Sequence, residues 1–175
     1  MANGDDWVRR FHTGTVSATV TAAGAVDVDS VRSGPARMLG RLMRLPPPTA
    51  GQTARLRIVR RAEGAVAHER WIRAFGAVRL ATRLVRAGER AGERIGPLEL
   101  RMRCRTTASD VWFLPDGAAI SFGRLSFRLP GLIAPRAYAH AWSSGDRAFD
   151  VEVSVRIPLL GVLMSYRGHF MEAEE

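Results

Sequence analysis

Two segments of the chain carry the side chains whose types and spacing are best suited to chemistry. In the first, Tyr138, His140 and Trp142 alternate with alanines. Because alternate residues of an extended strand point to the same side, these three side chains share one face. At the mouth of a barrel they would form an aromatic wall that contacts a flat ligand, with the imidazole as general acid or base. They fit equally an aromatic ladder on the sheet surface with a hydrogen-bonded histidine.

The second segment places Glu69, Trp71, Arg73 and Phe75 on one face of a strand. An inward-facing Arg73 would orient a carboxylate or enolate oxygen of a ligand. An ion pair between Glu69 and an arginine is the purely structural alternative. Glu93, which precedes a Gly-Pro turn, would serve either as a general base or as a cap of its loop.

Residues 129–135 form an apolar loop bounded by prolines, with Leu132 and Ile133 at its centre. A loop of this composition would be an unusual patch if it were exposed. We therefore expect either a lid folded over a cavity or a docking surface. Its position directly before Tyr138, His140 and Trp142 in the sequence favours the pocket.

The sequence lacks the motifs of several other chemistries. Its four histidines are not paired at metal-ligand spacing, and Cys104 is the only cysteine, so we expect no metal. The glycines form no strand–G-x-G-x-x-G–helix unit, so we expect no nucleotide cofactor. No serine lies in a nucleophile elbow, which argues against a hydrolase. Cys104 lies on the apolar face of its strand, as a buried structural thiol does.

The positive charge is not arranged as in a nucleic-acid-binding protein. All 26 basic residues are arginines, and the net charge is +9. A dedicated binder clusters its basic residues and interleaves them with aromatic rings, whereas these arginines are spread along outward strand faces. Adhesion to anionic surfaces is the alternative. With neither a signal peptide nor an apolar run of about 18 residues, we expect a cytoplasmic protein without a transmembrane segment.

Alternation of apolar and polar residues dominates the elements that must position these side chains. Leu98, Leu100, Met102 and Cys104 share one face, and residues 149–157 repeat the pattern. The pattern predicts strands at about 54–61, 66–75, 77–86, 97–106, 109–114, 118–122, 124–129, 137–142, 148–157 and 162–170. Weaker alternation over 7–31 suggests further strands with a turn at Ala23-Gly24, and Pro115-Asp116-Gly117 predicts another turn.

One amphipathic helix is expected between residues 33 and 45, because Pro35 suits a first turn and three prolines follow Leu45. The short connections favour antiparallel pairing. We expect a mainly β protein: a single antiparallel barrel or strongly bent half-barrel of about ten strands. Residues 1–6 would be a flexible N-terminus and 7–175 a single β-rich domain.

Several motifs, in this order, resemble one protein family: the helix ending at Leu45-Pro46-Pro47, Trp71-Ile72-Arg73-Ala74-Phe75, Glu93-Arg94-Ile95-Gly96-Pro97, Leu129-Pro130 with Pro135, Phe149-Asp150-Val151, Pro158-Leu159-Leu160-Gly161, Tyr166 and Gly168. From about residue 32 to residue 170 the chain resembles the domain-of-unknown-function family numbered four-one-six-six.

The resemblance implies a small β-rich domain associated with lipid- or polyketide-like metabolism. It also implies a reductase-like partner, since family members are often fused behind saccharopine-dehydrogenase-like or short-chain-reductase-like NAD(P)-binding domains. The chain departs from the family at two places. Ala81-Thr82 stands where a serine is usual, and Gly168-His169 replaces a Gly-Trp pair.

Together these observations predict a barrel that binds a small, largely apolar, polyketide- or acyl-like ligand. If it is an enzyme, it would be a cofactor-independent isomerase or cyclase of biosynthesis. The alternative is a non-catalytic module that docks on a separate reductase-like partner. The expected catalytic residues are His140, Tyr138 and Arg73, and the expected ligand-binding residues are Trp142, Trp71, Phe75, Leu132, Ile133 and Tyr166.

Overall fold

The computed structural model describes residues 4–30, 34, 35, 37, 38, 45–123 and 125–174. Its elements are α1 (Gly4–Thr13), β1 (Ala18–Ser30), β2 (Thr49–Glu63), β3 (Val66–Phe75), β4 (Val78–Ala87), β5 (Arg90–Ile95), β6 (Leu98–Thr106), β7 (Asp110–Phe122), β8 (Leu125–Arg128), β9 (Arg136–Gly145), β10 (Ala148–Ile157) and β11 (Gly161–Glu172).

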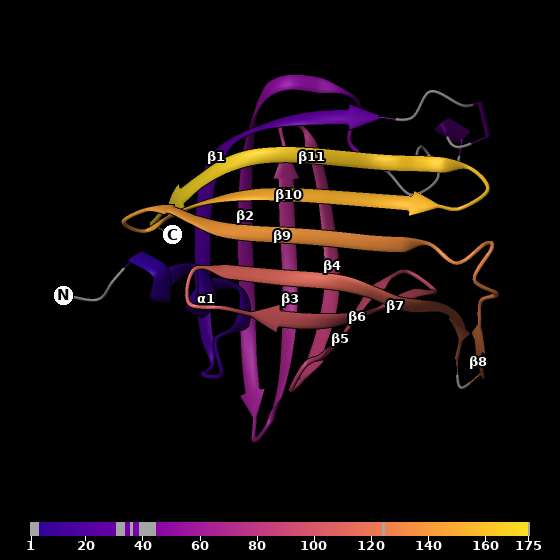
Figure 1. The fold of residues 1–175 in the computed structure, drawn as a ribbon, viewed down its shortest axis with the longest axis horizontal. Coiled ribbons are helices and arrows are strands. Elements are labelled where there is room, and N and C mark those ends of the chain that lie inside the picture. The colour runs from indigo at the N-terminus through magenta and orange to yellow at the C-terminus, as the bar shows by residue number, and fades with distance from the viewer. Residues whose placement is uncertain (1–3, 31–33, 36, 39–44, 124, 175) are drawn as a thin grey trace.

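Ten of the strands in this part of the chain close into an antiparallel barrel. They pair in the order β6-β5-β4-β3-β2-β1-β11-β10-β9-β7, and β7 pairs again with β6. Figure 1 shows β9, β10 and β11 crossing steeply over β2, β3 and β4, as strands do on opposite walls of a barrel. The short strand β8 pairs with the end of β7 outside the closed ring. The expected antiparallel barrel is confirmed.

Antiparallel order divides the strand connections between two ends of the barrel. The connections β2–β3, β4–β5, β6–β7 and β9–β10 lie at the end that α1 occupies, which we call the helix end. The connections β3–β4, β5–β6, β7–β8, β8–β9 and β10–β11 lie at the opposite end, the distal end. Inward side chains alternate with exposed ones, as in β2, where Leu56 and Ile58 are buried and Arg55, Arg57 and Val59 are exposed.

The helix α1 fills the helix end of the barrel. Trp7, Val8, Phe11 and His12 form its buried face, and their spacing is that of one side of a helix. The rings of Trp7 and Phe11 pack against Phe149 on β10, with centroids 5.4 and 5.2 Å away. The expectation of strands from residue 7 is therefore wrong for residues 7–13, where the apolar period is helical.

Two expected turns are also wrong, because each lies inside a continuous strand. Ala23-Gly24 is in the middle of β1, where a Cβ at Gly24 would collide with the backbone of His169 on β11. The glycine therefore permits a close approach of two strands. The segment Pro115-Asp116-Gly117 is a bulge in β7, where the register with β6 shifts.

Two further elements differ from the sequence-based expectation in extent. The alternation did not predict β5, since its sequence Arg-Ala-Gly-Glu-Arg-Ile has few apolar residues. Most of the helix expected over residues 33–45 lies outside the described residues, although 34, 35, 37 and 38 are helical. In the described part of the chain, no helix has the length and apolarity needed to cross a membrane.

Candidate functional site

The barrel interior contains a cavity of about 90 Å³. Its wall is mostly aliphatic and aromatic, because β-strand alternation turns one apolar residue in two towards the axis. The lining includes Phe75, Leu100, Met102, Val153 and Met164. Its polar residues are His12, Arg55, Arg73, Glu93, Tyr138 and Tyr166. An apolar cavity with a few convergent polar groups is the usual form of a small-molecule site.

Three neighbouring strands bring a polar cluster to one side of this cavity. Arg73 on β3 donates from Nη1 to Glu93 Oε1 on β5, 2.8 Å away, and to Thr82 Oγ1 on β4, 3.0 Å away. The Thr82 hydroxyl donates to the same carboxylate oxygen at 2.5 Å. The Arg73 and Glu93 side chains expose only 15% and 11% of their surface. Arg73 and Glu93 thus balance each other's charge, and both side chains are largely shielded from water.

The surroundings keep Arg73 charged and Tyr166 neutral. Burial lowers the pKa of Arg73, but the attraction of Glu93 and a hydrogen bond with Tyr166 outweigh it, so the pKa is raised. Burial raises the pKa of Tyr166, against the opposing influence of Arg73. Since a guanidinium can only donate, the phenol oxygen accepts the hydrogen bond from Arg73. The phenolic hydrogen is left to donate to another oxygen.

His12 brings an acceptor to the helix end of the cavity. Its Nδ1 lies 3.0 Å from the carbonyl oxygen of Val8, so Nδ1 carries the hydrogen and Nε2 is the acceptor. Burial lowers the pKa of His12 from 6.5 to about 4. The imidazole is therefore neutral at physiological pH.

Because His12 is buried in its neutral form, the free energy of unfolding falls as the pH is lowered from 6.5 to about 4. In this range the unfolded chain binds a proton that the folded chain does not, so acid favours unfolding. We expect the parent protein to lose about 3 kcal/mol more than a His12→Leu variant between pH 7 and pH 4. Urea unfolding of both proteins at the two pH values measures this difference, and equal losses would contradict it.

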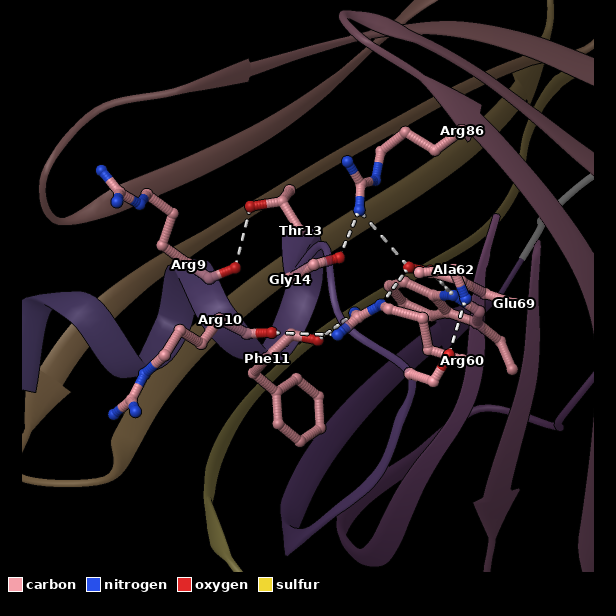
Figure 2. Close-up of polar contacts among 11 residues, drawn as sticks. Arg9, Arg10, Phe11, Thr13, Gly14, Arg60, Ala62, Glu69 and Arg86 are labelled. Carbon is pink, nitrogen blue, oxygen red and sulfur yellow. Dashed lines mark hydrogen bonds and ion pairs between the residues drawn. The ribbon is translucent and has the colours of Figure 1, made fainter. Parts of the chain in front are cut away.

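A second buried ionic cluster fixes α1 in the helix end (Figure 2). Glu69 on β3 accepts hydrogen bonds from Arg60 Nε and from Trp71 Nε1, both at 2.6 Å, and lies 3.6 Å from Arg86. Arg60 also donates to the carbonyl oxygens of Arg10 and Phe11 in the last turn of α1. Cations at a helix C-terminus satisfy its free carbonyl groups and oppose its dipole. The cluster of Glu69, Arg60 and Arg86 therefore holds α1 in place. Its charges are paired with one another and are not available to a ligand in the cavity.

The aromatic strand lies on the other side of the barrel wall. His140 stacks on Trp112 of β7, with ring centroids 3.4 Å apart, and its Nε2 lies 2.8 Å from Asp110 Oδ1. Trp142 packs beside His140, and the Tyr138 ring packs against Trp112. On the same strand Ala137, Ala139 and Ala141 line the cavity. This is the surface ladder with a hydrogen-bonded histidine, although Tyr138 also borders the cavity.

The apolar loop 129–135 connects β8 to β9. Both of these strands pair with β7, β8 with Ala119–Phe122 and β9 with Asp110–Phe113. Leu129 packs against the core and donates from its backbone N to the Ala118 carbonyl, while Ala134 is buried. Leu132 and Ile133 remain exposed at the loop tip. Part of the loop thus covers the core, and its tip faces outwards.

The structure therefore brings together only some of the residues singled out in the sequence. Arg73, Trp71, Phe75 and Tyr166 meet around the cavity. His140 and Trp142 lie on the outer face, and Leu132 and Ile133 at the distal end. The sequence did not single out Thr82 as a site residue. Its hydroxyl joins the cluster of Arg73 and Glu93, close to the position where the family resemblance expects a serine. Its signal was a polar residue between Leu80 and Leu84, on the inward face of β4.

Known proteins give one informative match to this chain. The family model described as "Domain of unknown function (DUF4166)" matches residues 6–170. No curated protein matches the chain. Among solved structures, the "Dehydratase domain from CurJ module of Curacin polyketide synthase" is similar to it with a TM-score of 0.22 and 4% identity, over 97% of this chain and 82% of that one. A score this low supports no inference about function.

Proposed function

The chain belongs to the family described as "Domain of unknown function (DUF4166)", and we propose that it binds a short, largely apolar, oxygen-bearing molecule inside its barrel. The observation that carries this proposal is the buried cluster of Arg73, Glu93, Thr82 and Tyr166 at the wall of an apolar cavity. Hydrophobic packing alone would fill such an interior with apolar side chains. Hydrogen-bond donors directed at an apolar space are typical of ligand sites.

The charge balance of the cluster favours a neutral ligand oxygen over a charged one. Arg73 is already neutralised by Glu93, 2.8 Å away. A ligand carboxylate would add a buried negative charge without a new cation, which is costly. A neutral carbonyl oxygen has no such cost and accepts hydrogen bonds from the Tyr166 hydroxyl and the Arg73 guanidinium. The site therefore favours a ketone, ester or thioester group over a carboxylate.

The cavity volume limits the ligand. About 90 Å³ is less than the ~150 Å³ of an engineered apolar cavity that binds benzene. The site thus suits the carbonyl end of an acyl- or polyketide-like molecule and a few carbons beside it. Trp71, Phe75 and Met102 would contact those carbons.

The same groups suit enolisation, which is the chemistry of a cofactor-free isomerase or cyclase. The Glu93 carboxylate would accept a proton from the carbon next to the carbonyl. Arg73 and Tyr166 would stabilise the negative charge that develops on the oxygen. In a β,γ-unsaturated carbonyl compound the dienolate would extend to the γ-carbon, and transfer of the proton from Glu93 to that carbon would give the conjugated isomer without a redox partner. In deuterated water, exchange of the proton held by Glu93 would place deuterium at the γ-carbon, and Glu93→Gln would abolish the incorporation.

Extraction of the native ligand tests the binding proposal. The freshly purified protein is examined by native mass spectrometry, then denatured and extracted with organic solvent for mass spectrometry of the extract. We expect a stoichiometric apolar carbonyl compound in the parent and its absence in Tyr166→Phe, which removes the hydroxyl that donates to the ligand and accepts from Arg73. The same compound in equal amount in both proteins would contradict the assigned site.

Docking on a reductase-like protein remains a second candidate function, favoured by the exposure of Leu132 and Ile133 at the tip of the 129–135 loop. Under this proposal, native mass spectrometry would show an empty barrel. A Leu132→Ser variant would then lose its partner in a pull-down, while Tyr166→Phe would retain it.

A further inference from the structure

A group of large apolar side chains is exposed at the distal end of the barrel. We call it the distal rim; its members are Phe122, Leu125, Phe127, Leu132, Ile133 and Leu159, each between 47% and 68% exposed. Figure 1 shows β8 and the connections β8–β9 and β10–β11 along the same side of the molecule. Exposed apolar groups of this size mark a surface that binds something.

The β7–β8 hairpin presents the largest part of this rim. Phe122 lies opposite Leu125, and Phe127 is two residues further along β8, so all three side chains share one face of the hairpin. All four residues of β8 are exposed. A projecting hairpin with one apolar face is suited to insertion into an apolar medium.

Arginines adjoin the rim. Arg136 on β9 lies directly opposite Arg156 on β10. Like charges placed opposite each other destabilise a sheet. Among the described residues, no ion pair joins Arg136 or Arg156 to a carboxylate. This uncompensated positive charge therefore calls for an anionic partner.

We propose that the distal rim docks on an anionic lipid bilayer. Apolar side chains inserted at the level of the headgroups and arginines paired with lipid phosphates or carboxylates are the two components of peripheral membrane binding. Four of the six rim side chains, those of Leu125, Leu132, Ile133 and Leu159, have no ring on which a base can stack, so the rim is better suited to a bilayer than to RNA. This surface is independent of the cavity, so the proposal stands whether or not the barrel holds a ligand.

Vesicle flotation with the full chain tests this surface. The probes are phosphatidylcholine vesicles with and without phosphatidylserine. We expect binding that requires phosphatidylserine and weakens at high salt. Phe127→Ser and Leu132→Ser should each weaken it about tenfold, through lost apolar burial. Arg136→Gln should weaken it about fivefold.

Two exposed residues near the helix end provide matched controls. Val16→Ser removes an equally exposed apolar side chain, and Arg61→Gln removes the same charge. We expect neither to change vesicle binding. Absence of binding, or an equal effect of Arg61→Gln and Arg136→Gln, would overturn the proposal. It would also be overturned if light scattering showed a dimer that Leu132→Ser dissociates, or if RNA competed fully with the vesicles.

Discussion

Replacing Glu69 by alanine is expected to destabilise the fold by about 3 to 5 kcal/mol. The Glu69 carboxylate is completely buried and is shared by Arg60 and Arg86. Its removal leaves two guanidinium groups out of water without a counter-charge and takes the acceptor from the Trp71 ring nitrogen. The loss is a large part of the 5–15 kcal/mol typical of a domain. Urea unfolding followed by circular dichroism measures it.

Glu99→Ala is the matched control for Glu69→Ala. Glu99 also accepts a hydrogen bond from an arginine, Arg101, but this pair lies on the outer face of β6 with 26% and 44% of its side chains exposed. Exposed pairs contribute at most about 1 kcal/mol. Should Glu69→Ala be too unstable to purify, Glu69→Gln retains one acceptor oxygen and allows the measurement. Equal losses for Glu69→Ala and Glu99→Ala would show that the buried cluster does not hold the fold together.

Replacing Arg73 and Glu93 together is expected to separate stability from binding. Arg73→Leu alone leaves the Glu93 carboxylate buried without its cation and should cost about 3 to 5 kcal/mol. With Glu93→Leu added, no charge is buried and most of that loss should be recovered. The double variant nevertheless lacks the charged donor. We expect its affinity for 2-pentanone to be roughly tenfold to a hundredfold lower.

Isothermal titration of the parent and the double variant with 2-pentanone checks the loss of affinity. Butanoate, which has the same number of non-hydrogen atoms, is the control ligand. We expect it to bind the parent more weakly than the ketone, because Glu93 already balances the charge of Arg73. A double variant that binds the ketone as the parent does would remove Arg73 from the site.

The sequence predicted the strands whose apolar faces are continuous. The alternation over Phe149–Ile157 placed β10 at its observed bounds, since period two has one structural meaning. The same rule put Glu69, Trp71, Arg73 and Phe75 on one face, and all four point into the barrel. It failed for β5, whose buried positions are the small Ala91 and the charged Glu93. It also failed for α1, because this helix of ten residues has only four buried side chains, too few to show a clear helical period.

The candidate site was less predictable, because it depends on register between strands distant in sequence. Arg73 meets Glu93 only because β3, β4 and β5 are neighbours in the barrel. Alternation shows that Tyr138, His140 and Trp142 share a face, but not which face is inside. The small alanines between them are the inward residues. Barrel interiors near a cavity tolerate small residues, so aromatic size was a misleading guide to burial.

Carbon-13 labelling of the methionine methyl groups shows whether a ketone enters the barrel. Met102 and Met164 line the cavity, whereas Met171 is 56% exposed on β11. On titration with 2-pentanone, we expect the Met102 and Met164 methyl resonances to shift and saturate while the Met171 resonance stays in place. Shifts confined to Met171, or none at saturating ketone, would contradict a ligand site inside the barrel.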